Sequence, residues 1–172
     1  MAKIATLITD MFEDVEYTEP AKAFNEAGHE LINIEKEAGK KVTGKQGEAV
    51  VTIDKGIDDV NPDEFDALLL PGGFSPDQLR GDDRFVTFTK AFMDSKKPVF
   101  AICHGPQLLI TAKALEGRKA TGFKSIQVDM EYAGATVVDE EVVVCQDQLV
   151  TSRQPDDIPA FNRESLKLLE NK

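Results

Sequence analysis

Residues 99–106 read Val99-Phe100-Ala101-Ile102-Cys103-His104-Gly105-Pro106, an apolar run of four residues that ends in a thiol, an imidazole and a turn. An earlier stretch has the same layout, since the apolar residues 67–70 end in Pro71-Gly72-Gly73. Uninterrupted apolar runs of this length are typical of strands covered on both faces, as in a parallel sheet flanked by helices. Both turns are therefore predicted to lie at the carboxyl ends of parallel strands.

The rest of the chain alternates between predicted strands and predicted helices. Strands are predicted at 4–9, 31–34, 142–145 and 149–152, a hairpin or edge strand pair at 42–53, and helices at 20–27, 85–93, 107–115 and 159–169. This alternation predicts an open, doubly wound α/β sheet with its sites at the carboxyl edge. Because no repeat, low-complexity tract or Pro/Gly/Ser linker interrupts the pattern, residues 1–172 are expected to form a single domain.

Composition and charge exclude several classes of protein. A net charge of −11 argues against a stable nucleic-acid interface, which needs clustered Lys and Arg. The apolar start soon meets Asp10, Glu13 and Asp14, so neither a signal peptide nor a membrane helix is predicted, and we expect a cytoplasmic protein. Two cysteines and two histidines provide neither a disulfide framework nor a tetrahedral zinc site, so no metal is expected.

Cys103 has the position of a nucleophile in a strand-to-helix turn. Such a turn exposes a reactive side chain, and the free N–H groups of the following helix lower the pKa of a thiol and can hold an oxyanion. Gly105 is expected to let a substrate approach the backbone. The alternative is a buried structural cysteine that ends a strand. For Cys145, which ends the apolar run 142–144, core packing is the preferred interpretation.

Four motifs stand in order along the chain: Phe12-Glu13-Asp14-Val15-Glu16, Leu70-Pro71-Gly72-Gly73, Ala101-Ile102-Cys103-His104-Gly105-Pro106-Gln107 and Thr151-Ser152-Arg153. Together they resemble the DJ-1/PfpI superfamily over nearly the whole chain. The resemblance is strongest to short bacterial proteins known as PfpI-type cysteine proteases, general stress proteins and protein deglycases. It implies a flavodoxin-like, three-layer sandwich with a mostly parallel central sheet, usually in a homodimer or a higher oligomer.

Matched by position, the resemblance assigns a role to each candidate site residue. Cys103 corresponds to the nucleophile, and Glu13 to the carboxyl group that hydrogen-bonds its sulfur, with a raised pKa that lets it donate and shuttle a proton. The alternative for Glu13 is a solvated loop acid. His104 would be oriented by Asp77 of a neighbouring subunit, where related proteases carry the longer Glu. The backbone N–H groups of Gly73 and His104 would form the oxyanion hole.

Three functions follow from this interpretation. The first is an enzyme, without cofactor, that uses Cys103 to act on reactive dicarbonyls or on glycated proteins and nucleotides, as a deglycase or a glyoxalase. The second is peptide hydrolysis by Cys103, His104 and Asp77, completed at a subunit contact. The third is a non-enzymatic holdase or an oxidation sensor. Arg153 is expected either to bind a substrate carboxylate or to form an exposed ion pair.

Overall fold

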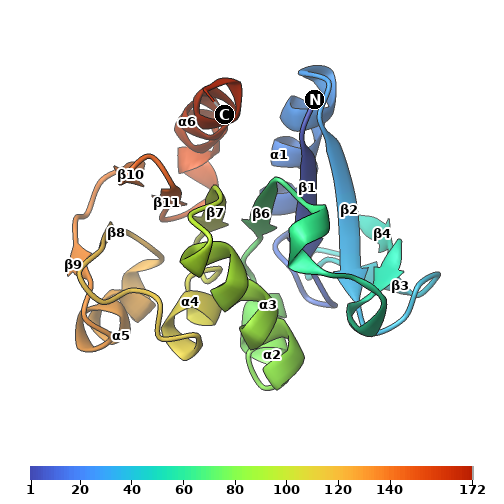
Figure 1. The fold of residues 1–172 in the computed structure, drawn as a ribbon, viewed down its shortest axis with the longest axis horizontal. Helices are drawn as coiled ribbons and strands as arrows, with labels where there is room; N and C mark the ends of the chain where they lie inside the picture. The colour runs from blue at the N-terminus through green and yellow to red at the C-terminus, as the bar shows by residue number, and fades with distance from the viewer. Residues whose placement is uncertain (172) are drawn as a thin grey trace.

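A seven-stranded sheet forms the centre of the molecule, whose computed structural model describes residues 1–171 (Figure 1). All neighbouring strands in it run parallel except the pair β10 and β11 at one edge. In spatial order the strands are β10 (Val143–Cys145), β11 (Leu149–Ser152), β7 (Val99–Ile102), β6 (Ala67–Leu70), β1 (Lys3–Leu7), β2 (Glu30–Glu35) and β5 (Lys55–Gly56).

The two apolar runs that ended in turns are the central strands β6 and β7. Every residue of both strands is fully buried, which explains why neither shows the polar alternation of a half-exposed strand. The two strands pair in parallel, with Leu70 beside Ala101, so the turns that follow them lie next to each other. The strand order reverses between β1 and β6, and sites in such sheets form at that carboxyl edge.

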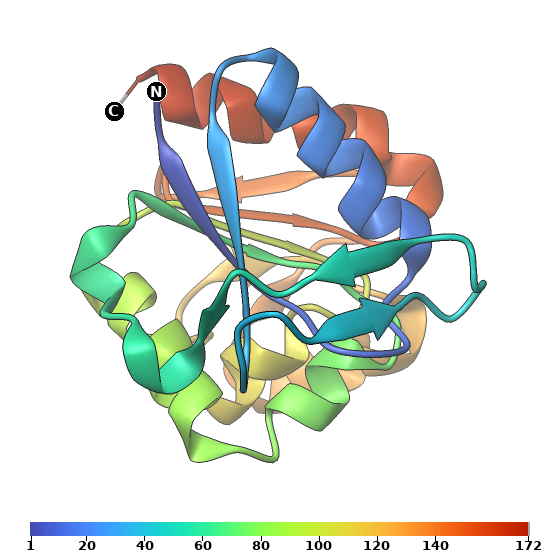
Figure 2. The same ribbon diagram turned by 90° about the vertical axis from the view of Figure 1, so that its right-hand side faces the viewer.

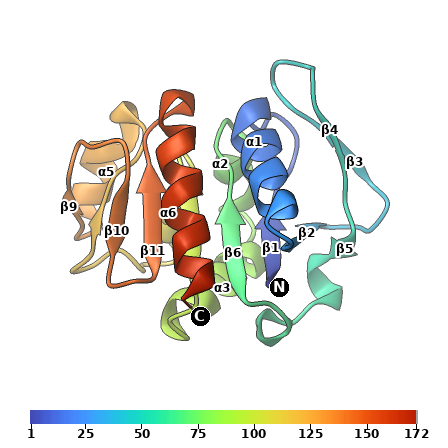
Figure 3. The same ribbon diagram turned by 90° about the horizontal axis from the view of Figure 1, so that it is seen from above.

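Helices cover both faces of the sheet and complete three layers. Helices α1 and α6 pack against each other on one face, and α2, α3 and α4 lie on the other, as Figures 2 and 3 show. The short helix α5 lies beyond the β10 edge. The bounds are α1 (Asp14–Glu26), α2 (Ser75–Leu79), α3 (Asp83–Asp94), α4 (Gln107–Thr111), α5 (Gln127–Tyr132) and α6 (Ile158–Glu170).

Small elements complete the chain. An antiparallel hairpin, β3 (Lys41–Thr43) and β4 (Val50–Thr52), stands apart from the main sheet, and β8 (Lys119–Ala120) pairs in parallel with β9 (Thr136–Val137). The 3₁₀ helices are η1 (Ile57–Asp59), η2 (Pro62–Glu64), η3 (Lys124–Ile126) and η4 (Pro155–Asp157). Among residues 1–171, no helix has the length and apolar character needed to cross a membrane.

The predicted fold class is confirmed, while the predicted start of α1 and the predicted end of α4 are wrong. Helix α1 begins at Asp14, six residues before the predicted start, and therefore contains Pro20. Helix α4 ends at Thr111 rather than at 115, because Lys113 adopts a positive φ of 56° that no α-helix accommodates. The hairpin at 42–53 exists, but it forms its own two-stranded sheet instead of extending the edge of the main one.

Candidate active site

The chain turns sharply at Cys103, directly after β7. Its φ is +62°, a left-handed conformation that a residue with a side chain adopts only when the surrounding structure enforces it. Two backbone hydrogen bonds do so here: the Cys103 N–H donates to the Ser152 carbonyl (3.0 Å), and the Cys103 carbonyl accepts from the Phe123 N–H (2.9 Å). The predicted position of the thiol in a strand-to-helix turn is thus observed.

Two glycines allow the backbone to close around this turn. A Cβ on Gly72 would lie 2.4 Å from the Glu16 Oε1 atom and 2.9 Å from the Cys103 Cβ. A Cβ on Gly105 would lie 2.3 Å from the Leu70 carbonyl oxygen. The prediction that Gly105 gives a substrate room to approach is therefore wrong, since its missing side chain faces strand β6.

The carboxyl group beside the Cys103 sulfur belongs to Glu16. Its Oε1 atom accepts a hydrogen bond from the Gly72 N–H (3.0 Å), whereas Oε2 is buried and has no hydrogen-bond partner within residues 1–171. The Cys103 thiol is close enough to the carboxyl group to affect its pKa. Glu16 is completely buried, and burial raises the pKa of its carboxyl group to about 8. At neutral pH Glu16 is consequently protonated and able to donate a hydrogen bond to the sulfur.

Glu13, which the motif comparison placed against the sulfur, lies elsewhere. Its Oε2 atom forms an ion pair with the Lys45 Nζ atom (2.9 Å), and its Oε1 atom accepts a hydrogen bond from the Gln46 side chain (3.3 Å). The structure therefore corrects the assignment by three residues, to Glu16. The physical reason is the register of α1: Glu13 precedes the helix, whereas Glu16 lies almost one turn further on, on its buried face.

A signal for Glu16 was present in the sequence. The residues Glu16, Pro20 and Phe24 are spaced by four, and all three are buried along one stripe of α1. The stripe is hidden when the helix is taken to begin at Pro20, since Glu16 then falls in a loop. Helical periodicity, rather than the motif alone, identifies the carboxyl group at the sulfur.

The thiol pKa also departs from the prediction. Burial raises the pKa of Cys103, and charge on Glu16 would raise it further, whereas the backbone N–H groups of His104 and Gly73 at the sulfur lower it. The expected lowering by a helix N-terminus is wrong, because α4 is a single short helix of five residues that begins four positions after the thiol. The two N–H groups assigned to an oxyanion hole do lie at the sulfur.

His104 does reach the thiol. Its Nδ1 atom lies 3.4 Å from the Cys103 Sγ atom, and its ring stacks on Phe123 with 4.8 Å between centroids. Burial and the positive charges of Lys45 and Arg80 lower the pKa of His104, against the opposite effect of Asp77. The imidazole is therefore neutral at pH 7 and available as a base.

Asp77 stands on the short helix α2 and makes no bond to the His104 of its own chain. Its carboxylate is largely exposed and pairs with Arg80, with 3.2 Å between Oδ1 and Nη2. It is nevertheless close enough for its charge to act on His104. Its predicted role toward a neighbouring subunit stays a prediction.

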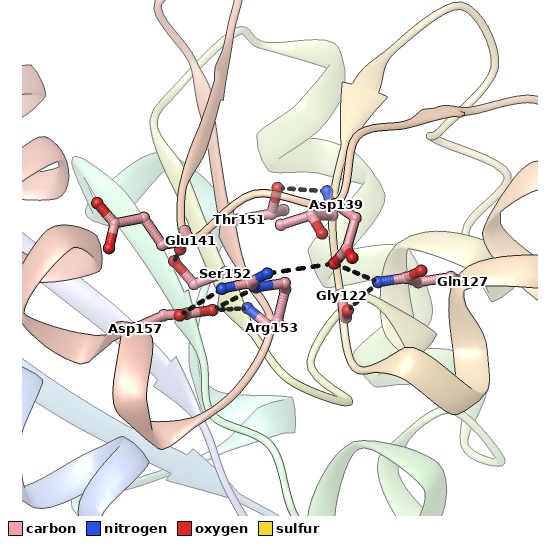
Figure 4. Close-up of polar contacts among 9 residues, drawn as sticks. Gly122, Gln127, Asp139, Glu141, Thr151, Ser152, Arg153 and Asp157 are labelled. Carbon is pink, nitrogen blue, oxygen red and sulfur yellow. Dashed lines mark hydrogen bonds and ion pairs between the residues drawn. The ribbon is translucent and has the colours of Figure 1, made fainter.

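Arg153, directly after β11, forms ion pairs with Asp139 and Asp157, as Figure 4 shows. Its Nε and Nη2 atoms both donate to Asp157 (3.0 Å each), and Nη1 donates to Asp139 (3.3 Å), which also accepts from Gln127 (3.4 Å). The ion-pair alternative is thus the observed one, with a buried partner in Asp157. The bond from Arg153 to Asp139 connects residues 119–141 to the end of β11. This segment includes Phe123, whose ring stacks on His104.

Cys145 lies at the end of β10, remote in sequence from this site. It is a free, buried cysteine and belongs to the apolar cluster on the α3 face of the sheet. This location agrees with the predicted role in core packing.

The fold and the site together define a class: an α/β sandwich that holds a cysteine in a strained strand-to-helix turn beside a buried acid. Residues 2–168 match the DJ-1/PfpI family, and the chain belongs to it. A solved ThiJ/PfpI domain protein from Brachyspira murdochii superposes with a TM-score of 0.92 at 28% identity, covering 99% of this chain and 97% of that one.

Three curated relatives align over nearly their whole length. General stress protein 18 of Bacillus subtilis is 79% identical over 98% of both chains, and "Putative cysteine protease YraA" of the same organism is 61% identical over 98% of both. Protein/nucleic acid deglycase 2 of Escherichia coli is 69% identical over 97% of both. Two of these three names are those of enzymes.

Proposed function

We propose that this chain is a cysteine-dependent enzyme that repairs early glycation adducts of proteins and nucleotides and acts on the free dicarbonyls that form them. Cys103 is the nucleophile and Glu16 the proton shuttle. The observation that carries the proposal is the pairing of the buried Cys103 sulfur with a carboxyl group whose pKa is about 8. The similarity to a relative named as a protein/nucleic acid deglycase supports the substrate class.

The Glu16 and Cys103 pair supplies a nucleophile although burial opposes a free thiolate. When the pair loses one proton, it holds either a thiolate that accepts a hydrogen bond from the acid or a carboxylate that accepts one from the thiol. The N–H groups of His104 and Gly73 point at the sulfur and favour the first state. The acid keeps a proton that it can deliver once the sulfur has reacted.

The chemistry balances within the substrate and water. The thiolate adds to the aldehyde carbon of a compound such as methylglyoxal, a C–S bond forms, and the oxygen takes a proton from Glu16. In an early adduct this carbon is saturated and carries a hydroxyl group and the amine. Its C–N bond breaks with proton transfer to nitrogen, which releases the repaired amine and restores the aldehyde to which the thiolate adds. A base then moves the proton on that carbon to the neighbouring one, which gives a thioester without an external oxidant. Water hydrolyses the thioester to lactate and restores the thiol.

The residues around the sulfur have distinct tasks in this scheme. After it has given up its proton, Glu16 is the first candidate base for the carbon-bound proton. Neutral His104, with Nδ1 3.4 Å from the sulfur, is the second. The N–H groups of Gly73 and His104 are released from the sulfur as it bonds to carbon and can then hold the oxygen that develops charge. We further propose a cytoplasmic homo-oligomer, with peptide hydrolysis as the alternative activity if the relative named as a cysteine protease is the better guide.

The test uses purified protein with methylglyoxal and, separately, with a methylglyoxal-treated peptide. We expect lactate from the first and unmodified peptide from the second, both lost in Cys103→Ser because a serine hydroxyl is not ionised at neutral pH. Cys145→Ser is the matched control and should retain both. Wild-type turnover in Cys103→Ser, or loss confined to Cys145→Ser, would refute the assignment.

A further inference from the structure

A lysine on the β3–β4 hairpin lies beside the thiol site. The Lys45 N–H donates to the Phe12 carbonyl (2.8 Å), which fixes the loop against the segment that precedes α1. The Lys45 Nζ atom lies 2.9 Å from the Glu13 carboxylate and 5.6 Å from the centroid of the Phe74 ring. Phe74 directly follows Gly73, whose N–H meets the sulfur, so this ammonium stands at the rim of the site.

The loop that carries Lys45 is held by a buried carboxylate. Asp14 accepts hydrogen bonds from the backbone N–H groups of Gln46 (2.9 Å), Glu48 (3.0 Å) and Ala49 (2.8 Å), although it is almost fully buried. Burial alone would raise the pKa of Asp14, but these hydrogen bonds lower it, so the carboxylate stays charged. An anchored loop of this kind fixes where the lysine charge acts.

The charges that face the thiol and its histidine come from several elements. Glu16 and Glu13 face it from α1 and the residue before α1, Lys45 from the hairpin, and Asp77 and Arg80 act on His104 from α2. The charge of Lys45 acts on Cys103, Glu16 and His104, and it lowers the pKa of the latter two. Within a chain of net charge −11, Lys45 is thus a local positive charge at the rim of the thiol site.

We propose that Lys45 is a positioning residue that stabilises negative charge on the Cys103 sulfur and favours electrophiles that carry an anionic group, and that Glu13 attenuates this effect as its ion-pair partner. The substrate class that fits is carbonyl adducts bearing a carboxylate or phosphate near the reacting carbon, glycated nucleotides among them. The proposal rests on the proposed function only in taking Cys103 as the nucleophile. It gives Glu13 a task at the site without contact to the sulfur.

The experiment compares two alkylating probes of similar size, anionic iodoacetate and neutral iodoacetamide, on a Cys145→Ser background in which Cys103 is the remaining thiol. The ratio of their second-order rates cancels changes in access to the buried sulfur and reports the local charge. We expect Lys45→Gln to lower the iodoacetate to iodoacetamide ratio about threefold and to move the pH midpoint of alkylation upward. Glu13→Gln should raise the ratio by a similar factor and move the midpoint downward.

Lys41→Gln is the matched control, since Lys41 is an exposed residue of β3 on the same hairpin and its charge lies outside the site. Its ratio should equal that of the background protein. An unchanged ratio in Lys45→Gln, or shifts of the same sign in Lys45→Gln and Glu13→Gln, would overturn the proposal. Because the readout is alkylation, it stands even if methylglyoxal proves not to be a substrate, and the two failures are distinguishable.

Discussion

Glu13, Asp14 and Glu16 are three carboxylates within four residues, and the structure gives each of them a different environment. Glu13 pairs with Lys45 at the rim, Asp14 accepts three backbone N–H groups from the hairpin loop, and Glu16 lies buried at the sulfur. The intrinsic acidities of Asp14 and Glu16 are nearly the same, so the lowered pKa of Asp14 and the raised pKa of Glu16 come from their surroundings, chiefly burial and hydrogen-bond partners. A motif read by position alone cannot separate such residues.

At this scale Glu16→Gln is the informative substitution. The glutamine amide can still donate a hydrogen bond to the sulfur and accept one from Gly72, but it cannot transfer a proton. We expect alkylation of Cys103 at pH 7 to be retained, while turnover of methylglyoxal falls by more than about 100-fold. Normal turnover in this variant would move the proton transfer to His104 or to water.

The same variant should change how stability depends on pH. The folded-state pKa of Glu16, about 8, lies above its usual value of 4.5, so the folded state binds the extra proton between these values. The stability that Glu16 contributes is therefore fully present below pH 4.5 and is lost as the pH rises through 8. Glutamine does not titrate. The free energy of unfolding of Glu16→Gln relative to wild type should therefore be higher at pH 8 than at pH 5 by more than about 1 kcal/mol.

Urea unfolding at the two pH values measures this difference. Asp94→Asn is a suitable control, because Asp94 is an exposed residue at the end of α3 and its substitution should give the same difference from wild type at both pH values. A constant difference for Glu16→Gln as well would show that Glu16 is ionised in the folded protein.

At the scale of elements, six strands of the main sheet and the helices α3 and α6 were predictable from the sequence. The start of α1, the end of α4, the hairpin placement and the short elements β5, β8, β9, α2 and α5 were not. Strands β6 and β7 can be recognised in the sequence because burial on both faces leaves no polar position in either run. The start of α1 was missed because Pro20 suits a first helical turn, yet here it lies seven residues into the helix. The hairpin position depends on Asp14, more than thirty residues away from its partners, and no local pattern reports that contact.

The anchoring of the hairpin yields a prediction for Asp14→Asn. An asparagine keeps one acceptor oxygen and puts an NH₂ group where the carboxylate accepts backbone N–H groups, so buried donors lose their partner. We expect a loss of about 2 kcal/mol in the free energy of unfolding, and an iodoacetate to iodoacetamide ratio as low as that of Lys45→Gln.

Glu19→Gln serves as the control, since Glu19 is an exposed residue on the same helix. It should change the unfolding free energy by less than about 0.5 kcal/mol. If Asp14→Asn were equally mild, the three hydrogen bonds would not hold the loop, and the placement of Lys45 would need another explanation.

At the scale of the whole molecule, the layered core explains why the sequence predicts the location of the site but not the pKa of its thiol. Parallel strands bring the turns after β6 and β7 together, which places Gly73, Cys103 and His104 side by side. The pKa of the thiol depends instead on how much protein covers it, and burial overrides the effect expected from a short following helix. How deeply the thiol is buried is a property of the assembled fold, because residues distant in the sequence cover it.

One question at this scale is whether a second subunit completes the site. Met11 and Phe74, joined by a backbone hydrogen bond of 2.8 Å, are large apolar residues that remain exposed beside the thiol. Asp77, three residues after Phe74, is also exposed. If this edge is covered by a partner copy in solution, Asp77 can orient the His104 of that copy, as predicted from the family resemblance.

Asp77→Asn tests this arrangement through two activities. Amide hydrolysis needs an imidazole that protonates a poor leaving group, whereas addition of the thiolate to an aldehyde does not. We therefore expect Asp77→Asn to slow cleavage of a fluorogenic peptide at least tenfold more than turnover of methylglyoxal. Dilution of the wild type below the dissociation constant of the oligomer should have the same effect. Asp94→Asn is the matched control, because it also removes an exposed intrahelical ion pair, the one with Lys90, on α3.

Light scattering at each protein concentration gives the oligomeric state, which is then compared with the two reaction rates. Equal losses in both activities would refute this division between the two reactions. Peptide cleavage that persists in a demonstrated monomer would mean that each chain carries a complete site and that Asp77 serves only its own Arg80.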